Sequence, residues 1–195
     1  MKPHNPLYYR WKGKLLHSGI HILSHMRLLI RWTFFSVFTG SIMGLIGVAF
    51  VYCIQSVTTL RTNFVWMPLT LPLGGLLIVW LYRISHDQND KGTNMVLASL
   101  RSEAELPVQM APMIFISTII THLCGGSAGR EGAALQLGGS VGNLLGRLFR
   151  LNERDIRVMI LCGMSAAFSA IFRTPIAAAV FAMEVGCVGA MQYAA

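Results

Sequence analysis

The residues best placed to do chemistry lie in one glycine-rich run, where Arg130 and Glu131 stand side by side. The run reads CGGSAGREGAALQLGGSVG from Cys124 to Gly142 and is otherwise made almost wholly of small and apolar residues. Glycines let the backbone turn sharply and leave its N–H groups accessible. Because the start of a helix offers free amides and about half a unit of positive charge, the run predicts an anion-binding helix N-terminus.

Glu131 has a defined role beside such a site. The ionised carboxylate competes with the anion for the same amides, and the protonated form stops competing, so the side chain can gate the path and carry a proton. The alternative is an ion pair with Arg130 or Arg157 that only satisfies two charges, and spacing alone favours neither. A nucleotide-binding loop does not fit, because no Lys-Ser/Thr pair follows the glycines and no strand precedes them.

The composition indicates that this helix lies in a membrane. Of the 195 residues 54% are hydrophobic and 12% are charged, which is too apolar for one soluble domain. We therefore expect an all-α polytopic membrane protein surrounded by lipid. Its net charge of +8 does not indicate a nucleic-acid partner, because the basic residues cluster at the ends of apolar segments.

The N-terminal segment is basic and carries no acidic residue before residue 32. By the positive-inside rule we expect this segment, residues 1–30, to stay in the cytoplasm and residues 31–195 to form the membrane part. Residues 1–31 carry six cationic side chains: Lys2, Arg10, Lys12, Lys14, Arg27 and Arg31. Three histidines at four-residue spacing, His17, His21 and His25, are interpreted as a solvated amphipathic face rather than as metal ligands.

Three apolar stretches in the first two thirds of the sequence predict long helices. No residue between Arg31 and Arg61 is charged, which allows one tilted transmembrane helix. In this helix Gly40, Gly44 and Gly47 form a stripe of small residues that another helix can approach closely. Residues 62–82 predict a broken turn followed by a second helix, and residues 106–123 predict a third long helix. Between them a short helix is expected to open with Thr93 or Asn94 as its N-cap.

The later apolar stretches, 132–146, 158–172 and 174–193, are separated by charged breaks. The first two are too short for simple spans and predict half-helices buried in a helical bundle. In the first of them Gly138, Gly142 and Gly146 share one face, which predicts tight packing. The break between the first two, RLFRLNERDIR, is mainly basic and is assigned to the cytoplasmic side. The single cysteines Cys53, Cys124, Cys162 and Cys187 predict small core residues, and we expect no metal and no cofactor.

The string GSAGREGAALQLGGSVGNLLG resembles the GREGP segment of the CLC family of chloride channels and chloride/proton antiporters. The string FSAIFRTPIAAAVFAMEV is similar to the helix pair that follows this segment in the family. The resemblance runs from about Arg31 to Glu184 and implies the first inverted-repeat half of a CLC-type fold, with broken and re-entrant helices. The family is normally a homodimer with one pore in each subunit.

The resemblance also implies roles for single residues. Gly129, Arg130, Glu131 and Gly132 match the anion-site helix, and Glu131 falls on the external gating glutamate. Ala133 stands where many members have proline. The sequence KGTNM replaces the family's first anion motif, GSGIP, with Gly92 matching a glycine and Thr93 standing in for the serine hydroxyl.

Because the fluoride/proton branch of the family departs at the same two places, fluoride is an alternative to chloride as the transported ion. Glu184 matches the first of two acidic residues of the proton-coupled exchangers, and Val185 occupies the inner proton-transfer position. Channel members also have valine there, so the resemblance favours passive chloride conduction, as in a voltage-gated chloride channel, over chloride/proton exchange. The other reading of Glu184 is a buried carboxyl that hydrogen-bonds a neighbouring helix.

The family's second half has no counterpart in this sequence, which predicts a truncated or split protein. A nonconducting membrane assembly subunit is therefore a further hypothesis. A membrane-embedded enzyme, with His122 as a base near Glu131, is a third, and we do not expect enzyme activity. The expected setting is a bacterial plasma membrane, and the expected partner is a second copy or a separate second-half chain.

Overall fold

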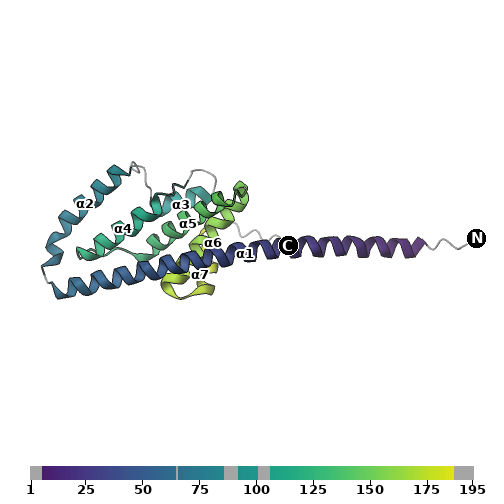
Figure 1. The fold of residues 1–195 in the computed structure, drawn as a ribbon, viewed down its shortest axis with the longest axis horizontal. Helices are drawn as coiled ribbons and strands as arrows, with labels where there is room; N and C mark the ends of the chain where they lie inside the picture. Colours follow the sequence, from purple (N-terminus) through teal and green to yellow (C-terminus); the bar gives the residue numbers. More distant parts are fainter. Residues whose placement is uncertain (1–5, 65, 86–91, 101–105, 187–195) are drawn as a thin grey trace, which may run out of the picture. The chain divides into compact units, whose positions relative to one another are not determined.

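The computed structural model describes residues 6–64, 66–85, 92–100 and 106–186, with side chains from Met26 onwards. Within these ranges the chain is built of helices and contains no strand, which confirms the all-α prediction. Figure 1 shows the helices α1 (Pro6–Asn63), η1, a 3-10 helix (Met67–Thr70), α2 (Leu71–Ile84), α3 (Thr93–Leu100), α4 (Met110–Leu123), α5 (Arg130–Leu148), α6 (Glu153–Phe172) and α7 (Pro175–Gly186).

The chain divides into two compact units, Met1–Phe38 and Thr39–Ala195. In the first unit, the described side chains include an aromatic group in α1, in which Trp32 meets Phe35 edge-on at 5.9 Å between ring centroids. The Arg31 guanidinium lies 5.5 Å from the centroid of the Phe35 ring, a cation–π distance that stabilises a cation near apolar surroundings. The helix is continuous across residues 30 and 31, and the predicted division there stays a prediction. The side chains of His17, His21 and His25 lie outside the described part.

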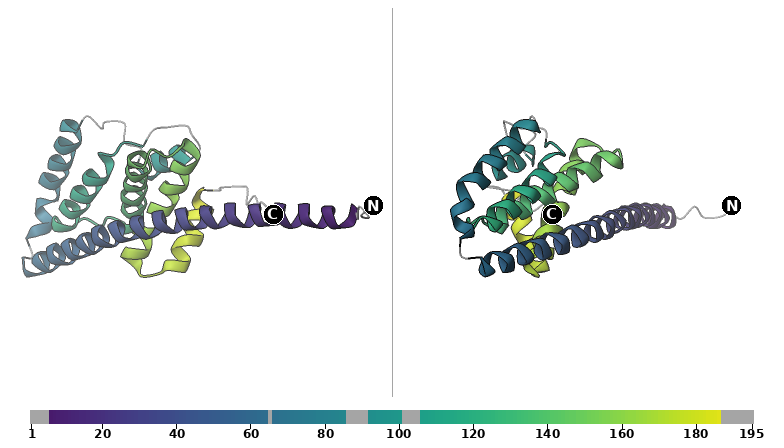
Figure 2. Two further views of the ribbon diagram at one scale, coloured as in Figure 1. Left: turned by 45° about the vertical axis from the view of Figure 1, so that its right-hand side comes forward. Right: turned by 60° about the vertical axis from the view of Figure 1, so that its left-hand side comes forward.

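The second unit is a bundle in which α5 is the most buried helix. Helices α2, α4, α5, α6 and α7 pack as neighbours in chain order, and α3 packs against α5, α6 and α7 (Figures 1 and 2). Every residue from Ala133 to Gly146 except Leu144 is buried. This burial confirms the prediction for residues 132–146, although α5 is 19 residues long and extends beyond that range at both ends.

Helices α5 and α6 approach each other backbone to backbone. A Cβ atom added at Gly138 would collide with the carbonyl oxygen of Gly163, and one added at Gly142 would lie 3.0 Å from the Cα of Ile160. At Gly146 the nearest atom would be a side-chain carbon of Ile156 at 3.2 Å. The three predicted glycines therefore form the close-packing face of α5.

The glycine stripe of α1 is only partly used for packing. A Cβ at Gly47 would lie 2.7 Å from the Cβ of Ala170 in α6, whereas added Cβ atoms at Gly40 and Gly44 would have no neighbour within 4 Å among the described residues. The prediction that the stripe lets another helix approach is confirmed for Gly47 and stays a prediction for Gly40 and Gly44. The spacing shows which residues share a face, but only the crossing point decides which of them is covered.

Among the described residues, three helical stretches are long and apolar enough to cross a membrane: Met26–Asn63, Met67–Ile84 and Glu153–Phe172. The third corrects the prediction of a half-helix over residues 158–172. Helix α6 begins earlier, at Glu153, because the Asn152 side chain accepts a hydrogen bond of 2.8 Å from the backbone N–H of Asp155. Glu153 and Asp155 also place negative charge in its first turn, where the helix dipole favours it.

The predicted long helix over residues 106–123 is shorter than expected, because α4 begins at Met110 and has 14 residues. The preceding backbone has partners in α5 as well as in its own turn, because the carbonyl oxygen of Pro107 also accepts from the N–H of Met110 at 3.3 Å. Asn143 Nδ2 donates to the carbonyl oxygen of Leu106 at 2.7 Å, and Ser140 Oγ lies 3.0 Å from that of Pro107. These bonds satisfy carbonyl groups of a non-helical segment whose first described residue, Leu106, is buried.

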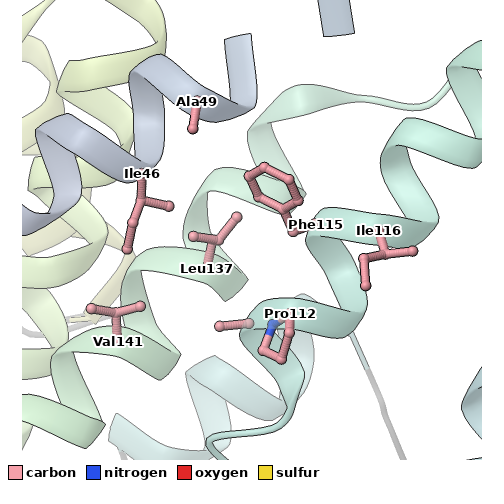
Figure 3. Close-up of a pocket in the computed structure, with 8 residues that line it drawn as sticks. Ile46, Ala49, Pro112, Phe115, Ile116, Leu137 and Val141 are labelled. Atoms are coloured by element: carbon pink, nitrogen blue, oxygen red, sulfur yellow. The ribbon is translucent and has the colours of Figure 1, made fainter. Parts of the chain in front are cut away.

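The second unit also contains three described cysteines and an apolar cavity. Cys124 is buried, Cys53 and Cys162 are half-buried, and none of these three forms a disulfide with a described residue, while Cys187 lies outside the described residues. A hollow of about 400 Å³ is lined by two residues of α1, four of α4 and two of α5. Figure 3 shows its labelled side chains, all of them apolar, among them Ile46, Phe115 and Leu137. It offers no donor to an ion and contains no predicted site residue.

Candidate anion site

The site is built on the first turn of α5. Gly129 precedes the helix in an extended conformation, with φ −68° and ψ 138°, and the helix begins at Arg130. No side chain caps this start. Because the first amides of a helix have no partner within it, this end presents free N–H donors and the positive end of the helix dipole.

Glu131 lies in the first turn and is exposed. It makes no hydrogen bond and no ion pair with any residue in the described part of the chain, so neither Arg130 nor Arg157 pairs with it there. Arg130 is half-buried and Ala133 is buried. The carboxylate is therefore held by no partner among the described residues, and its side chain can rotate towards or away from the amides.

The start of α3 meets the first turns of α5. Gly92 has φ +61°, a left-handed conformation that favours glycine, and its carbonyl oxygen accepts from the N–H of Met95 at 3.0 Å. The helix begins at Thr93, so this residue lies in the first turn rather than before it. A Cβ added at Gly132 would lie 3.2 Å from Thr93 Oγ1, which shows how closely the hydroxyl approaches α5.

Gln136 joins this junction, although sequence reasoning did not single it out. Its Nε2 donates to Thr93 Oγ1 over 3.4 Å, and its Oε1 is buried with no hydrogen-bond partner among the described residues. The available signal was spacing, because Gln136 follows Gly132 by one helical turn inside an apolar stretch. The structure thus brings together Gly92, Thr93, Gly132 and Gln136.

Glu184 and Val185, the two predicted residues on α7, make no side-chain hydrogen bond with a described residue. Glu184 on α7 is exposed and makes no hydrogen bond with a described residue, so the reading of a buried, hydrogen-bonded carboxyl stays a prediction. Val185, which follows it, packs against the apolar cluster that includes Val96 and Met164. Neither residue has a described contact with Thr93 or Glu131.

His122 is engaged by its own helix. Its Nδ1 lies 2.8 Å from the carbonyl oxygen of Thr118, so Nδ1 carries the proton and donates it there. The structure gives it no contact with Glu131 among the described residues. No group of three His, Cys, Asp or Glu residues suited to a metal ion occurs in the part of the chain that was described.

The family is decided by a match over most of the chain. The family model described as voltage gated chloride channel matches residues 74–195, which include α5, α6 and α7. The chain belongs to the CLC family. The family resemblance of the GREG segment is thereby confirmed, and members of the CLC family are transporters or channels in membranes.

Individual relatives extend this result. A chloride/fluoride channel protein of Pseudomonas syringae pv. tomato is 32% identical over 166 residues, which are 85% of this chain and 37% of the relative. The H(+)/Cl(−) exchange transporter ClcA of Citrobacter koseri is 31% identical over 163 residues, 74% of this chain and 34% of the relative. A solved structure, a CLC-type fluoride/proton antiporter, is 36% identical with a TM-score of 0.74 and covers 80% of this chain and 40% of its own.

The structural likeness confirms the CLC-type membrane fold, and the apolar helices agree with an integral membrane protein. The chain spans between about one third and two fifths of the length of these relatives.

Proposed function

We propose that this chain takes part in anion transport across a membrane and that the start of α5 contributes an anion site gated by Glu131. The observation that carries the proposal is the uncapped start of α5, with an exposed carboxylate in its first turn. Free amides and the helix dipole attract an anion without the desolvation cost of a buried cation. Besides Glu131, the backbone of this turn is supplied by four residues: Gly129, Arg130, Gly132 and Ala133.

The second helix start supports the same proposal. Gly92 and Thr93 bring the N-terminus of α3 and one hydroxyl donor against Gly132 of α5. Two helix starts that meet inside a bundle are a common way for transporters to build an ion site within the membrane. The anion would lie between donors from both helices, and ionised Glu131 would compete for them.

Two candidates are proposed for the transported anion and for the coupling of its transport to protons. Passive chloride conduction is the first candidate, because Val185 offers no inner carboxyl for proton transfer and the family match is to voltage gated chloride channels. Fluoride/proton exchange is the second candidate. It is favoured by the 36% identity to a fluoride/proton antiporter and by Thr93 and Ala133 at the two departures from the chloride motifs. Glu184 is retained as a secondary acidic residue.

The test is anion efflux from liposomes that contain the purified chain, followed with chloride and fluoride electrodes. We expect efflux of at least one ion above that of empty liposomes, and the ratio of the two rates decides between the candidates. Protein that is folded and inserted but releases neither ion would contradict the proposal for this chain alone. It would favour the nonconducting assembly subunit instead.

The greater length of the relatives motivates a proposal about partners. A second copy of this chain, or a chain that supplies the remaining segments, would complete the path. Chemical cross-linking in the membrane would show a homodimer as a doubled mass and a separate partner as a different added mass. A chain that stays monomeric while it conducts anions would contradict both alternatives.

The orientation is a separate prediction. We expect the basic segment of residues 1–30 to face the cytoplasm of a bacterium, because cytoplasmic segments carry the excess of Lys and Arg. A cysteine placed at Ser18 should be labelled by an impermeant thiol reagent only after the cells are opened, and one placed at Asn63 should behave in the opposite way. Labelling of the Ser18 position in intact cells would reverse the proposed topology.

A further inference from the structure

Gln136 is the exception among the buried polar side chains of α5. Gln136, Ser140 and Asn143 are 7%, 0% and 3% exposed. Ser140 and Asn143 hydrogen-bond to the carbonyl groups of the segment before α4, but Gln136 Oε1 has no partner in the described part of the protein. A buried polar atom without a partner is costly, so such an atom in a native fold calls for a ligand, a water molecule or another explanation.

The place of the amide points to a ligand. Gln136 Nε2 lies 3.4 Å from Thr93 Oγ1, in the first turn of α3, and a Cβ added at Gly92 would lie 3.6 Å from the same nitrogen. The side chain thus reaches from α5 to the start of α3, where free backbone amides and the helix dipole favour negative charge.

The side-chain amide of Gln136 can face the Thr93 hydroxyl in two orientations, which differ by exchange of the amide oxygen and nitrogen. In one, Nε2 donates to Thr93 Oγ1 and leaves Oε1 unpaired. In the other, the Thr93 hydroxyl donates to Oε1, and Nε2 keeps its two N–H groups for a ligand. In either orientation one buried amide atom has no partner among the described residues, and in the second orientation this atom is a donor, which suits an anion.

We propose that Gln136 is a specificity-determining residue of the anion site, with its amide N–H groups donating to a small halide held at the start of α3. The inference rests on the proposed function and adds a donor to it. An added Cβ at Gly132 would lie 3.2 Å from the Thr93 hydroxyl, so the glycine keeps this junction free of a further side chain. The side-chain donor favours fluoride over chloride, since fluoride is the smaller halide and the stronger hydrogen-bond acceptor.

The experiment measures fluoride and chloride binding to the purified full chain in detergent by isothermal titration with their sodium salts. Gln136→Met keeps the length of the side chain and removes its donors, and Gln136→Glu keeps the shape but offers acceptors only. Gln55→Met, at an exposed position of α1, is the matched control. Thermal unfolding in halide-free buffer reports on the fold of each variant separately.

We expect Gln136→Met to weaken fluoride binding about tenfold, the effect of one lost hydrogen bond to a charged group, and to weaken chloride binding less. Gln136→Glu should weaken binding of both ions further, and Gln55→Met should change neither. A fluoride-to-chloride affinity ratio that is the same in the wild type and in Gln136→Met would overturn the inference and leave the proposed function standing. A wild-type chain that is folded and binds neither halide would overturn both.

Discussion

Replacing Glu131 by glutamine is expected to remove most of the pH dependence of anion flux. In the wild type the flux should rise as the pH falls, because protonation stops the carboxylate from competing with the anion for the amides of α5. An anion at a helix start is stabilised by about 1–2 kcal/mol in favourable sites, so the competition is worth roughly 5- to 30-fold in occupancy. Glutamine resembles the protonated carboxyl, so the variant should conduct at neutral pH as the wild type does in acid.

The measurement is anion flux from liposomes at a series of pH values from acid to neutral. Glu153→Gln is the matched control, because Glu153 is also an exposed glutamate in the first turn of a helix, α6. The control should keep the wild-type profile. An unchanged profile in Glu131→Gln, with protein that inserts normally, would remove the gating role. Since Glu131 has no partner among the described residues, the substitution should leave insertion intact.

Gly142→Ala is expected to destabilise the bundle by about 3 kcal/mol or more, at the upper end of the overpacking range. The added methyl group would collide with the carbonyl oxygen of Met159 and lie 3.0 Å from the Cα of Ile160. These are backbone atoms, so no change of rotamer relieves the contact, and α6 must move away. Gly163→Ala should act in the same way from the other helix, because its methyl group would lie 3.0 Å from the Cα of Gly142.

Gly44→Ala is the control for this prediction, since a Cβ there has no neighbour within 4 Å among the described residues. Alanine is favoured over glycine within a helix by about 1 kcal/mol, so the control should be neutral or stabilising. Unfolding in a denaturing detergent, followed by circular dichroism, would compare the variants. Equal stabilities of Gly142→Ala and Gly44→Ala would show that α5 and α6 do not pack as closely as the structure describes.

Several features of the site followed from short stretches of sequence. The run GGSAGREG predicts a helix start because glycines and a following apolar helix are local signals, and α5 indeed begins at Arg130. The tight face of Gly138, Gly142 and Gly146 followed from helical periodicity alone. The helix bounds were less accurate. A side-chain cap at Asn152 marks the earlier start of α6, and Ser140 and Asn143 hydrogen-bond to carbonyl groups of the segment before α4, which is not part of that helix.

The sequence by itself determined that this is an all-helical membrane protein, because hydropathy and charge asymmetry are properties of neighbouring residues. The CLC family followed from the resemblance of the GREG segment, which is also contained in one short stretch. The tertiary structure decided which distant groups meet. The contact between Gln136 and Thr93 joins residues 43 positions apart, and the exposure of Glu131 depends on what packs near the start of α5. Such contacts are set by how helices cross and which side chains the crossing buries, and a pattern along one helix does not contain that information.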